Sequence, residues 1–448
     1  MQGSERMHNR RMPIRLSISM LSLGMILFLL TSCGPTTGTG SQNGGKGSTT
    51  IKVASDLPVS GQDTANGKPA QDGAELAVKE ANEKHLIPGY QLEFVPKDDV
   101  GAQGVYDPDT GKKNVTELIG DALVTGVVGP FNSSVAQAEM PVANQAPIAL
   151  ISPSNTNTCL TQRGAKVNCT GAQDKVPTLR PTGNVTYFRI ATTDDHQGTV
   201  LADYLYQKAG YKKVYVIDDT TVYGVGLANI FSDEWKKLGG TIVGSRESKQ
   251  RSNDYGGTIA NVKNTKPDLV FFGGTDSQGG TQLRQQLLND SGTAELAFAG
   301  GDGIQNPSFA QVIGAKAGPT YATIAKVNET VLPSAKSFIE RYNKTYGESD
   351  YGSYSAAAYD CMNILIQAIK RALDGGAQTA KDSNDAEGGK TFREAVIEAM
   401  KKTDYNGVTG HHTFSADGDT SNKVISVWQI ANVNGKDTWK FVDQVAAQ

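Results

Sequence analysis

The chain has 448 residues, of which 38% are hydrophobic and 20% are charged, enough for a globular protein of two or three domains with ample core. Its formal net charge is −3 and no basic patch stands out, which argues against nucleic acid as a partner. The 50 glycines fit many short turns and close loop approaches.

The N-terminal segment, residues 1–32, is interpreted as a lipoprotein signal peptide rather than as part of the fold. A basic start is followed by Leu16–Leu30, an apolar run that is shorter than a typical membrane span. The run ends in Leu-Thr-Ser-Cys, which resembles a bacterial lipobox and implies cleavage before Cys33 and lipidation of its thiol. An ordinary signal peptide and a short membrane anchor remain as alternatives.

Residues 33–50 are rich in glycine, serine and threonine and are expected to form a flexible tether. Such a tether has a reach of roughly 20–25 Å. A lipid followed by a tether implies a globular body outside the cytoplasm, in the cell envelope, held beside a membrane.

From residue 51 onward, short apolar strands alternate with helices, as in doubly wound α/β folds. Strands are expected at 51–54, 90–95, 127–128, 148–151, 213–217, 241–244, 269–272 and 296–299. Helices are expected from Pro69 and at 113–125, 199–209, 223–238, 255–264, 278–289, 334–346, 354–373 and 391–400. The chain then ends in two strands, 412–414 and 423–430, joined by a hairpin turn.

The stretch Gly126–Thr158 holds the most informative polar residues. Ser133 and Ser134 follow one predicted strand and open a helix, while Ser154 and Thr156 follow the next strand. Ligands of open α/β sheets bind at the carboxyl ends of the strands. Because the free N–H groups and the dipole of a helix N-terminus favour an anion, the stretch predicts a site for a carboxylate-sized anion.

Polar residues also follow strands of the second half of the chain: Tyr223, Thr275, Asp276 and Asp302. They are expected to face the same cleft, although each of them also suits a turn or a helix cap. Two parallel sheets with a cleft between them fit a binding protein that closes on its ligand, and they fit many enzymes as well.

The sequence lacks the common catalytic and metal-binding motifs. It has no GxSxG, HExxH or CxxC, and the Gly-Val-Gly at 224–226 lacks the third glycine of a dinucleotide site. His411 and His412 begin a predicted strand and should point to opposite faces, so they are not expected to share a metal. We therefore expect no cofactor, no metal and no enzymatic activity.

Two of the four cysteines, Cys159 and Cys169, lie ten positions apart in a polar loop, and an exported location permits a disulfide between them. Closing so short a loop contributes about 2–3 kcal/mol. Cys361 lies in register with the apolar residues of its predicted helix and is expected to be a buried thiol.

Taken together, these residues resemble the branched-chain amino-acid-binding proteins of bacterial ABC importers, which are type I periplasmic binding proteins. The resemblance runs from residue 51 to the C-terminus and rests on the order and spacing of short motifs. These are Leu57-Pro-Val-Ser-Gly61, Val128-Gly-Pro130 with Ser133, Ile151-Ser-Pro153 with Thr156, Arg189 with Asp194 and Gln197, Tyr223-Gly224, the run 267–274, and Tyr354 with Asp360.

The resemblance implies an α/β fold of two Rossmann-like lobes with parallel sheets, joined by a hinge of three crossovers. Lobe 1 would comprise residues 51–189 and 327–408, and lobe 2 residues 190–326 and 409–448. It also implies a monomeric solute receptor that hands an amino acid to an ABC permease and performs no reaction.

By the same resemblance, the α-carboxylate of the ligand is held by Ser133 and by amides of the first polar loop, with Ser134 close by. The second polar loop supplies a carbonyl and a hydroxyl, which match Ser154 and Thr156. Asp302 matches the acid that binds the α-ammonium. A carboxylate that faces an ammonium forms a charge-assisted pair, which is stronger than a neutral hydrogen bond.

Tyr223 matches a tyrosine that closes over the ligand in the family, and Tyr354 keeps an aromatic residue at the site. The aliphatic pocket of the family usually has further aromatic residues where this chain has Asn66, Thr275 and Asp276. A buried carboxylate does not suit an apolar pocket unless it is paired. A polar or basic amino acid, or an amide-like molecule, is therefore expected as the ligand in place of leucine or isoleucine.

Two other functions stay open at this point. The same fold suits a receptor or sensor for an amide- or urea-type molecule. A hydrolase acting on a small amide is the alternative from another class of protein.

Overall fold

The computed structural model describes residues 49–163, 175–315 and 318–446. The predicted signal peptide, Cys33, Cys169 and all but the last two residues of the predicted tether lie outside these ranges. Among the residues described, no helix combines the length and the apolar character needed to cross a membrane.

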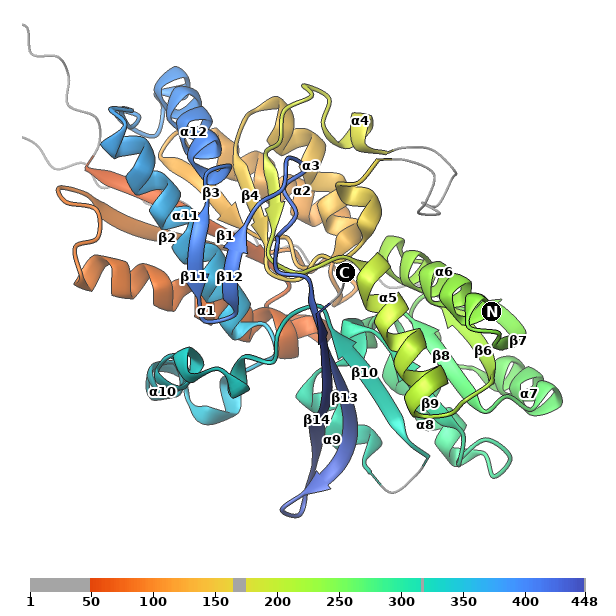
Figure 1. Ribbon diagram of the computed structural model, residues 1–448. Coiled ribbons are helices and arrows are strands. Elements are labelled where there is room, and N and C mark those ends of the chain that lie inside the picture. The colour runs from red at the N-terminus through yellow and green to blue at the C-terminus, as the bar shows by residue number, and fades with distance from the viewer. Residues whose placement is uncertain (1–48, 164–174, 316–317, 447–448) are drawn as a thin grey trace, which may run out of the picture. The chain divides into compact units, whose positions relative to one another are not determined.

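The first sheet has five parallel strands in the order β2-β1-β3-β4-β5 (Figure 1). These strands are β1 Thr50–Leu57, β2 Gln91–Asp98, β3 Val124–Val128, β4 Ala149–Ser152 and β5 Tyr187–Arg189. One face of the sheet packs against α1 Thr64–Glu83 and α11 Ser355–Asp374, and the other against α2 Pro108–Gly120 and α3 Ser133–Gln145. With α10 Pro333–Tyr346 and α12 Ala386–Met400, these elements form what we call the first lobe.

Side-chain alternation along the strands produces these two layers. In β4, Ile151 packs with α1 and α11, while Leu150 packs on the side of α3. The predicted apolar face of α1 is buried, and it consists of Ala70, Ala74, Ala77, Val78 and Ala81. Gly73 lets α1 approach the start of α11, because a Cβ at this position would lie 2.1 Å from the Ser355 carbonyl oxygen. Cys361 of α11 is a buried free thiol, as predicted.

The second sheet has seven strands in the order β14-β13-β10-β9-β8-β6-β7. They are β6 Lys213–Asp218, β7 Thr241–Glu247, β8 Leu269–Gly273, β9 Ala297–Gly300, β10 Thr320–Ile324, β13 Val424–Val433 and β14 Lys436–Ala446. β13 is antiparallel to both β10 and β14, so it runs opposite to the other six strands of the sheet.

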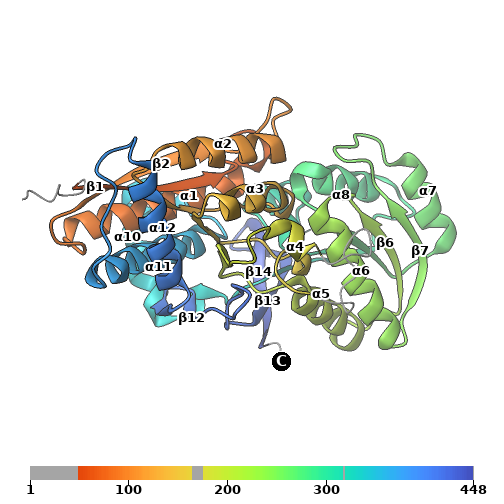
Figure 2. The same cartoon turned by 90° about the horizontal axis from the view of Figure 1, so that it is seen from above.

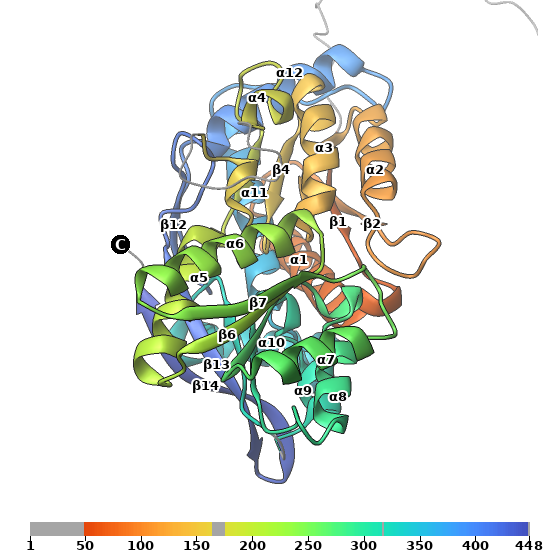
Figure 3. The same ribbon diagram turned by 90° about the vertical axis from the view of Figure 1, so that its right-hand side faces the viewer.

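Helices cover both faces of this second sheet, which with them forms the second lobe (Figure 3). One face packs against α5 Asp194–Asp203 and α6 Val222–Lys237. The other packs against α7 Gly256–Thr265, α8 Gly280–Asn289 and α9 Pro307–Ile313. β10 and α9 were not expected from the sequence.

The C-terminal strands pair differently from the predicted hairpin. β12 Gly410–Thr413 pairs with β11 Asp404–Gly407, while β13 pairs with β14. The pairing of 412–414 with 423–430 is therefore wrong, because β13 pairs with β14, which was not expected. The predicted turn does fold back on itself, with an antiparallel bridge between Phe414 and Thr420. The turn between β12 and β13 instead places Asp419 against the lobe junction, where its Oδ1 accepts a hydrogen bond at 2.7 Å from Nε of the buried Arg189.

The chain passes from the first lobe to the second after β5, returns after β10 and passes again after β12. Figure 2 shows α1, α2, α3, α11 and α12 gathered around the first sheet and α5 to α8 around the second. The residue limits given for the two lobes stay predictions.

Three helices, α1, α2 and α12, each begin about five residues before the predicted position. The start of α2 matters for the site. Asp107 is its N-cap and accepts a hydrogen bond at 2.7 Å from the Thr110 backbone N–H, and Pro108 occupies the first helical turn. The loop after β2 is therefore shorter than expected, and it ends with Tyr106 held next to a helix start.

Candidate functional site

Two neighbouring cavities are lined by residues of both lobes, an inner cavity of ≈ 30 Å³ and an outer cavity of ≈ 210 Å³. Seven of the residues predicted for binding line the inner cavity: Ser133, Ser134, Ser154, Thr156, Tyr223, Thr275 and Asp302. Its wall also includes Tyr106, Phe131, Asn132 and Gly303. The strand-end rule thus found most of the residues that the fold brings together.

One side of the inner cavity is the N-terminus of α3. Ser133 and Ser134 are the first residues of this helix, and the N-cap Asn132 makes no side-chain hydrogen bond to it. The Asn132 Oδ1 is buried and has no hydrogen-bond partner among the described residues. The first N–H groups of a helix have no partner within the helix, so this end offers donors and a positive dipole to an anion.

The two hydroxyls of the second polar loop have different surroundings. Ser154 donates its Oγ–H to the Phe131 carbonyl oxygen at 2.8 Å, which ties the two polar loops together. Thr156 is 1% exposed, and its Oγ1 has no partner in the part of the chain that the structure describes. The Thr156 hydroxyl is therefore free to bind a ligand, while the Ser154 hydroxyl already donates its proton to the Phe131 carbonyl oxygen.

Asp302 lies at the opposite side of the inner cavity and receives three hydrogen bonds. Its Oδ1 accepts from Tyr223 Oη at 2.8 Å and from Gln197 Nε2 at 2.8 Å. Its Oδ2 accepts from Tyr354 Oη at 2.6 Å. Burial raises the pKa of Asp302, and the three donors oppose the rise. Because Tyr354 precedes α11 of the first lobe, Asp302 also joins the two lobes.

Asp194, which was not predicted as a site residue, lies beside Asp302. It is fully buried, and its Oδ1 accepts from the same Gln197 Nε2 at 2.9 Å. Its Oδ2 has no partner among the described residues. Burial and the charge of Asp302 raise the pKa of Asp194 to about 8. Two buried carboxylates that share one amide donor leave acceptors for a cationic group.

Asp276 and Asn66, both predicted for the ligand side-chain pocket, line neither cavity. The Asp276 Oδ1 accepts from the Thr281 N–H at 3.2 Å, and its Oδ2 accepts from Asn306 Nδ2 at 3.2 Å. Asp276 therefore serves the start of α8. Asn66 lies in the first turn of α1. The acidic residue that suggested a polar pocket is thus engaged elsewhere.

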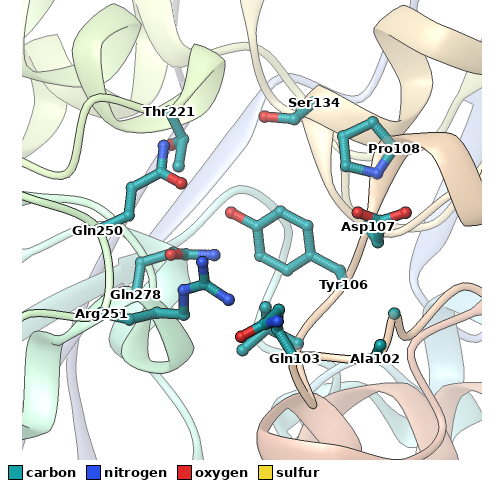
Figure 4. Close-up of a pocket in the computed structure, with 12 residues that line it drawn as sticks. Ala102, Gln103, Tyr106, Asp107, Pro108, Ser134, Thr221, Gln250, Arg251 and Gln278 are labelled. Atoms are coloured by element: carbon teal, nitrogen blue, oxygen red, sulfur yellow. The ribbon is translucent and has the colours of Figure 1, made fainter.

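Tyr106 lines both cavities and was not expected, because its segment was interpreted as a long loop. Its backbone N–H donates to Asp63 Oδ2 at 3.2 Å. Thr275 and Gln278 of the second lobe line these cavities with it, Thr275 the inner one and Gln278 the outer one. Burial raises the pKa of the Tyr106 phenol well above its usual value. Figure 4 shows the ring in the middle of the outer cavity.

Two further expectations concern cysteines and metals. Cys159 is buried, and its predicted partner Cys169 lies outside the described residues, so the pairing stays a prediction. Within the described ranges, no group of three or more histidine, cysteine or acidic side chains is arranged to hold a metal ion.

Comparison with known proteins finds one family model, described as periplasmic binding protein, that matches residues 50–438. Among curated proteins, a Leu/Ile/Val-binding protein homolog 3 from Brucella melitensis is 28% identical over 85% of this chain and 91% of its own length.

Solved structures with the same fold include a leucine-binding protein LivK from Thermotoga maritima, with a TM-score of 0.70 and 22% identity. That match covers 88% of this chain and 98% of the other. The branched-chain amino acid binding protein LivJ from Streptococcus pneumoniae, solved with isoleucine, has a TM-score of 0.68 and 26% identity, over 88% and 99% of the two chains. The predicted α/β fold of two lobes is confirmed.

Proposed function

The chain belongs to the periplasmic binding protein family, and on that premise we propose that it binds an α-amino acid between its lobes and delivers it to an ABC permease. One observation carries the proposal. The inner cavity has a donor-rich side at the N-terminus of α3 and a carboxylate at Asp302, whose Gln197 donor is shared with the buried Asp194. The zwitterion of an α-amino acid carries a carboxylate and an ammonium, so it needs hydrogen-bond donors on one side and acceptors on the other.

In this proposal the α-carboxylate lies at the first turn of α3, near Ser133 and Ser134. The α-ammonium lies between Asp302, Asp194 and the Thr156 hydroxyl. Each charged end of the ligand then meets buried groups of the opposite character, so the hydrogen bonds are charge-assisted. Tyr223 and Tyr354 fix the Asp302 carboxylate from the two lobes, which couples binding to lobe closure.

We further propose that the ligand side chain is polar or small rather than strictly aliphatic. This proposal does not rest on Asp276, because Asp276 lines neither cavity. Thr275 remains at the inner wall, and its hydroxyl lies 3.3 Å from that of Ser277. Beyond Tyr106 the outer cavity is lined by the amides Gln103, Gln250 and Gln278 (Figure 4). The names of the curated relatives point instead to leucine, isoleucine and valine.

The chain is proposed to act outside the cytoplasm as a lipid-anchored monomer that performs no reaction. The anchor rests on Cys33 and on the lipobox-like sequence before it. A Cys33→Ala variant should move from the membrane fraction to the soluble envelope fraction or the medium, while the wild-type chain sediments with membranes. Equal distribution of the two proteins would remove the anchor from the proposal.

Isothermal titration calorimetry with a panel of amino acids tests the binding function. One ligand per chain is expected, with heat from free α-amino acids only. The N-acetyl derivative of the best ligand lacks the ammonium, and its carboxamide lacks the carboxylate, so both should bind at least about 100-fold more weakly. Tight binding of either derivative, or its turnover during the titration, would contradict an amino-acid receptor.

A further inference from the structure

The two cavities meet at one aromatic side chain. Tyr106 and Ser134 are the residues that line both of them. Ser134 is small and lies at the start of α3, so the bulk of the shared wall is the Tyr106 ring. The inner cavity behind this ring is several times smaller than the outer one, ≈ 30 Å³ against ≈ 210 Å³.

Contacts from both lobes hold this ring in place. In the first lobe, the Tyr106 N–H donates to Asp63, and the following residue, Asp107, caps α2. In the second lobe, Thr275 lines the inner cavity together with Tyr106, and Gln278 lines the outer cavity together with it. Tyr106 is 6% exposed. A side chain that is buried between residues of both lobes has little room to move, so it forms a wall rather than a mobile cover.

We propose that Tyr106 is the partition that limits the length of the ligand side chain. The inference rests on the proposed amino-acid function and narrows it. With the charged ends of the ligand fixed at α3 and Asp302, the Tyr106 ring occupies the path from the inner cavity to the outer one. The protein then selects α-amino acids with short side chains, of the size of alanine or serine.

The residues that line the outer cavity determine which ligand side chains could enter it if the Tyr106 ring were removed. Besides three glutamines, its wall carries the Asp107 carboxylate and Arg251, whose side chain points into the cavity in Figure 4 and has no ion-pair partner among the described residues. Its backbone N–H is anchored to the Gln278 carbonyl at 2.9 Å. A chamber lined by amides, one guanidinium and one carboxylate offers both donors and acceptors, which suits an amide side chain.

The test compares the wild-type chain with Tyr106→Ala, and with Tyr106→Phe as the matched control that keeps the ring. Calorimetry measures the affinity for alanine, serine, glutamine, glutamate and lysine. The wild-type and Tyr106→Phe proteins should prefer alanine or serine to the three longer ligands. In Tyr106→Ala, the affinity for glutamine relative to alanine should rise at least about tenfold.

Equal size preference in Tyr106→Ala and wild type would overturn the partition, as would a wild-type preference for a long side chain. In both cases the amino-acid function stands, because binding itself is retained. If no amino acid binds any of the three proteins, the proposed function falls and the partition with it. If Tyr106→Ala does not fold, the wild-type size series decides alone.

Discussion

Two groups of buried carboxylates in this molecule differ in what compensates the cost of burying a negative charge. Asp194 and Asp302 lie at the cleft, and Asp302 is held by hydroxyl and amide donors from both lobes. Asp56, Asp99 and Glu139 lie in the first lobe and are fully buried. Neither cavity described above is lined by any member of this second group, which we call the core trio.

The core trio has almost no hydrogen-bond donors. Asp56 Oδ1 accepts from Asn114 Nδ2 at 2.9 Å. The other five carboxyl oxygens of Asp56, Asp99 and Glu139 have no partner among the described residues. Burial raises the pKa of all three groups, and their mutual repulsion adds to the rise for Asp99 and Glu139. The raised pKa values favour the protonated form of the core trio, whereas fixed donors, and in our proposal the ammonium of the ligand, compensate the cleft pair.

This difference shows that burial and a raised pKa do not identify a binding site by themselves. Both groups have them, but only the cleft pair lines or adjoins a cavity between two lobes. The cleft pair is expected to respond to ligand, and the core trio to pH. The first three predictions below separate these two responses.

The largest effect is expected at Asp302. Asp302→Asn keeps the shape of the side chain and removes the charge opposite the ammonium, so affinity should fall at least about 100-fold in calorimetry. Asp276→Asn is the matched control, because Asp276 serves the start of α8 and should change affinity less than about threefold. Similar losses in the two variants would mean that the site extends to Asp276.

Asp194 should give the binding its pH dependence. An ammonium binds the ionised carboxylate, and the pKa of Asp194 is raised to about 8. Affinity should therefore rise about 50-fold between pH 6 and pH 8, with proton release that appears as a buffer-dependent heat. In Asp194→Asn the profile should be flat and the affinity at pH 8 lower. A flat profile in the wild-type chain would assign the ammonium to Asp302 alone.

The core trio should make the protein less stable as pH rises, whereas ligand affinity should increase with pH. A carboxyl whose pKa is raised on folding binds more protons in the native state, so stability falls as pH rises above the unfolded-state pKa. Glu139→Gln removes this penalty. Its free energy of unfolding at pH 8 should exceed that of the wild-type chain by at least about 1 kcal/mol, with a smaller gap at pH 4.

Chemical denaturation at the two pH values measures this effect, and calorimetry of the same variant should show unchanged ligand affinity. A Glu139→Gln protein that is less stable at pH 8 would mean that the carboxyl has a partner that the described residues do not include.

The smallest effects concern the two hydroxyls of the second polar loop. Thr156→Val removes a hydroxyl that has no protein partner and should weaken binding about tenfold with little change in stability. Ser154→Ala removes the bond to the Phe131 carbonyl, so it should cost about 1 kcal/mol of stability and less than threefold in affinity. The reverse pattern would exchange the roles of the two residues.

The sequence predicted the parts of the site that depend on local order along the chain. Ser133, Thr156 and Asp302 each follow a strand, and the rule that ligands bind at strand carboxyl ends needs no long-range information. The alternation of strands and helices predicted the two-lobed fold in the same way. The core face of α1 and the buried thiol Cys361 follow from helical periodicity.

The features that the sequence did not predict depend on contacts between distant segments. Asp194 becomes one of a pair only because Gln197 reaches Asp302, 105 positions away. Tyr106 joins the site because the Asp-Pro start of α2 shortens its loop. Asp276 was assigned to the pocket because a strand-end acid and a helix cap look the same in sequence. β14 was not expected, and this led to the wrong pairing for β13.

Mass spectrometry of the small molecules released when the purified protein is denatured tests the central claim most directly. The account predicts one free α-amino acid per chain, recovered unchanged after prolonged incubation with fresh protein. Asp302→Asn prepared in parallel should release none. Recovery of a molecule without both an ammonium and a carboxylate, or its conversion by the protein, would contradict the account.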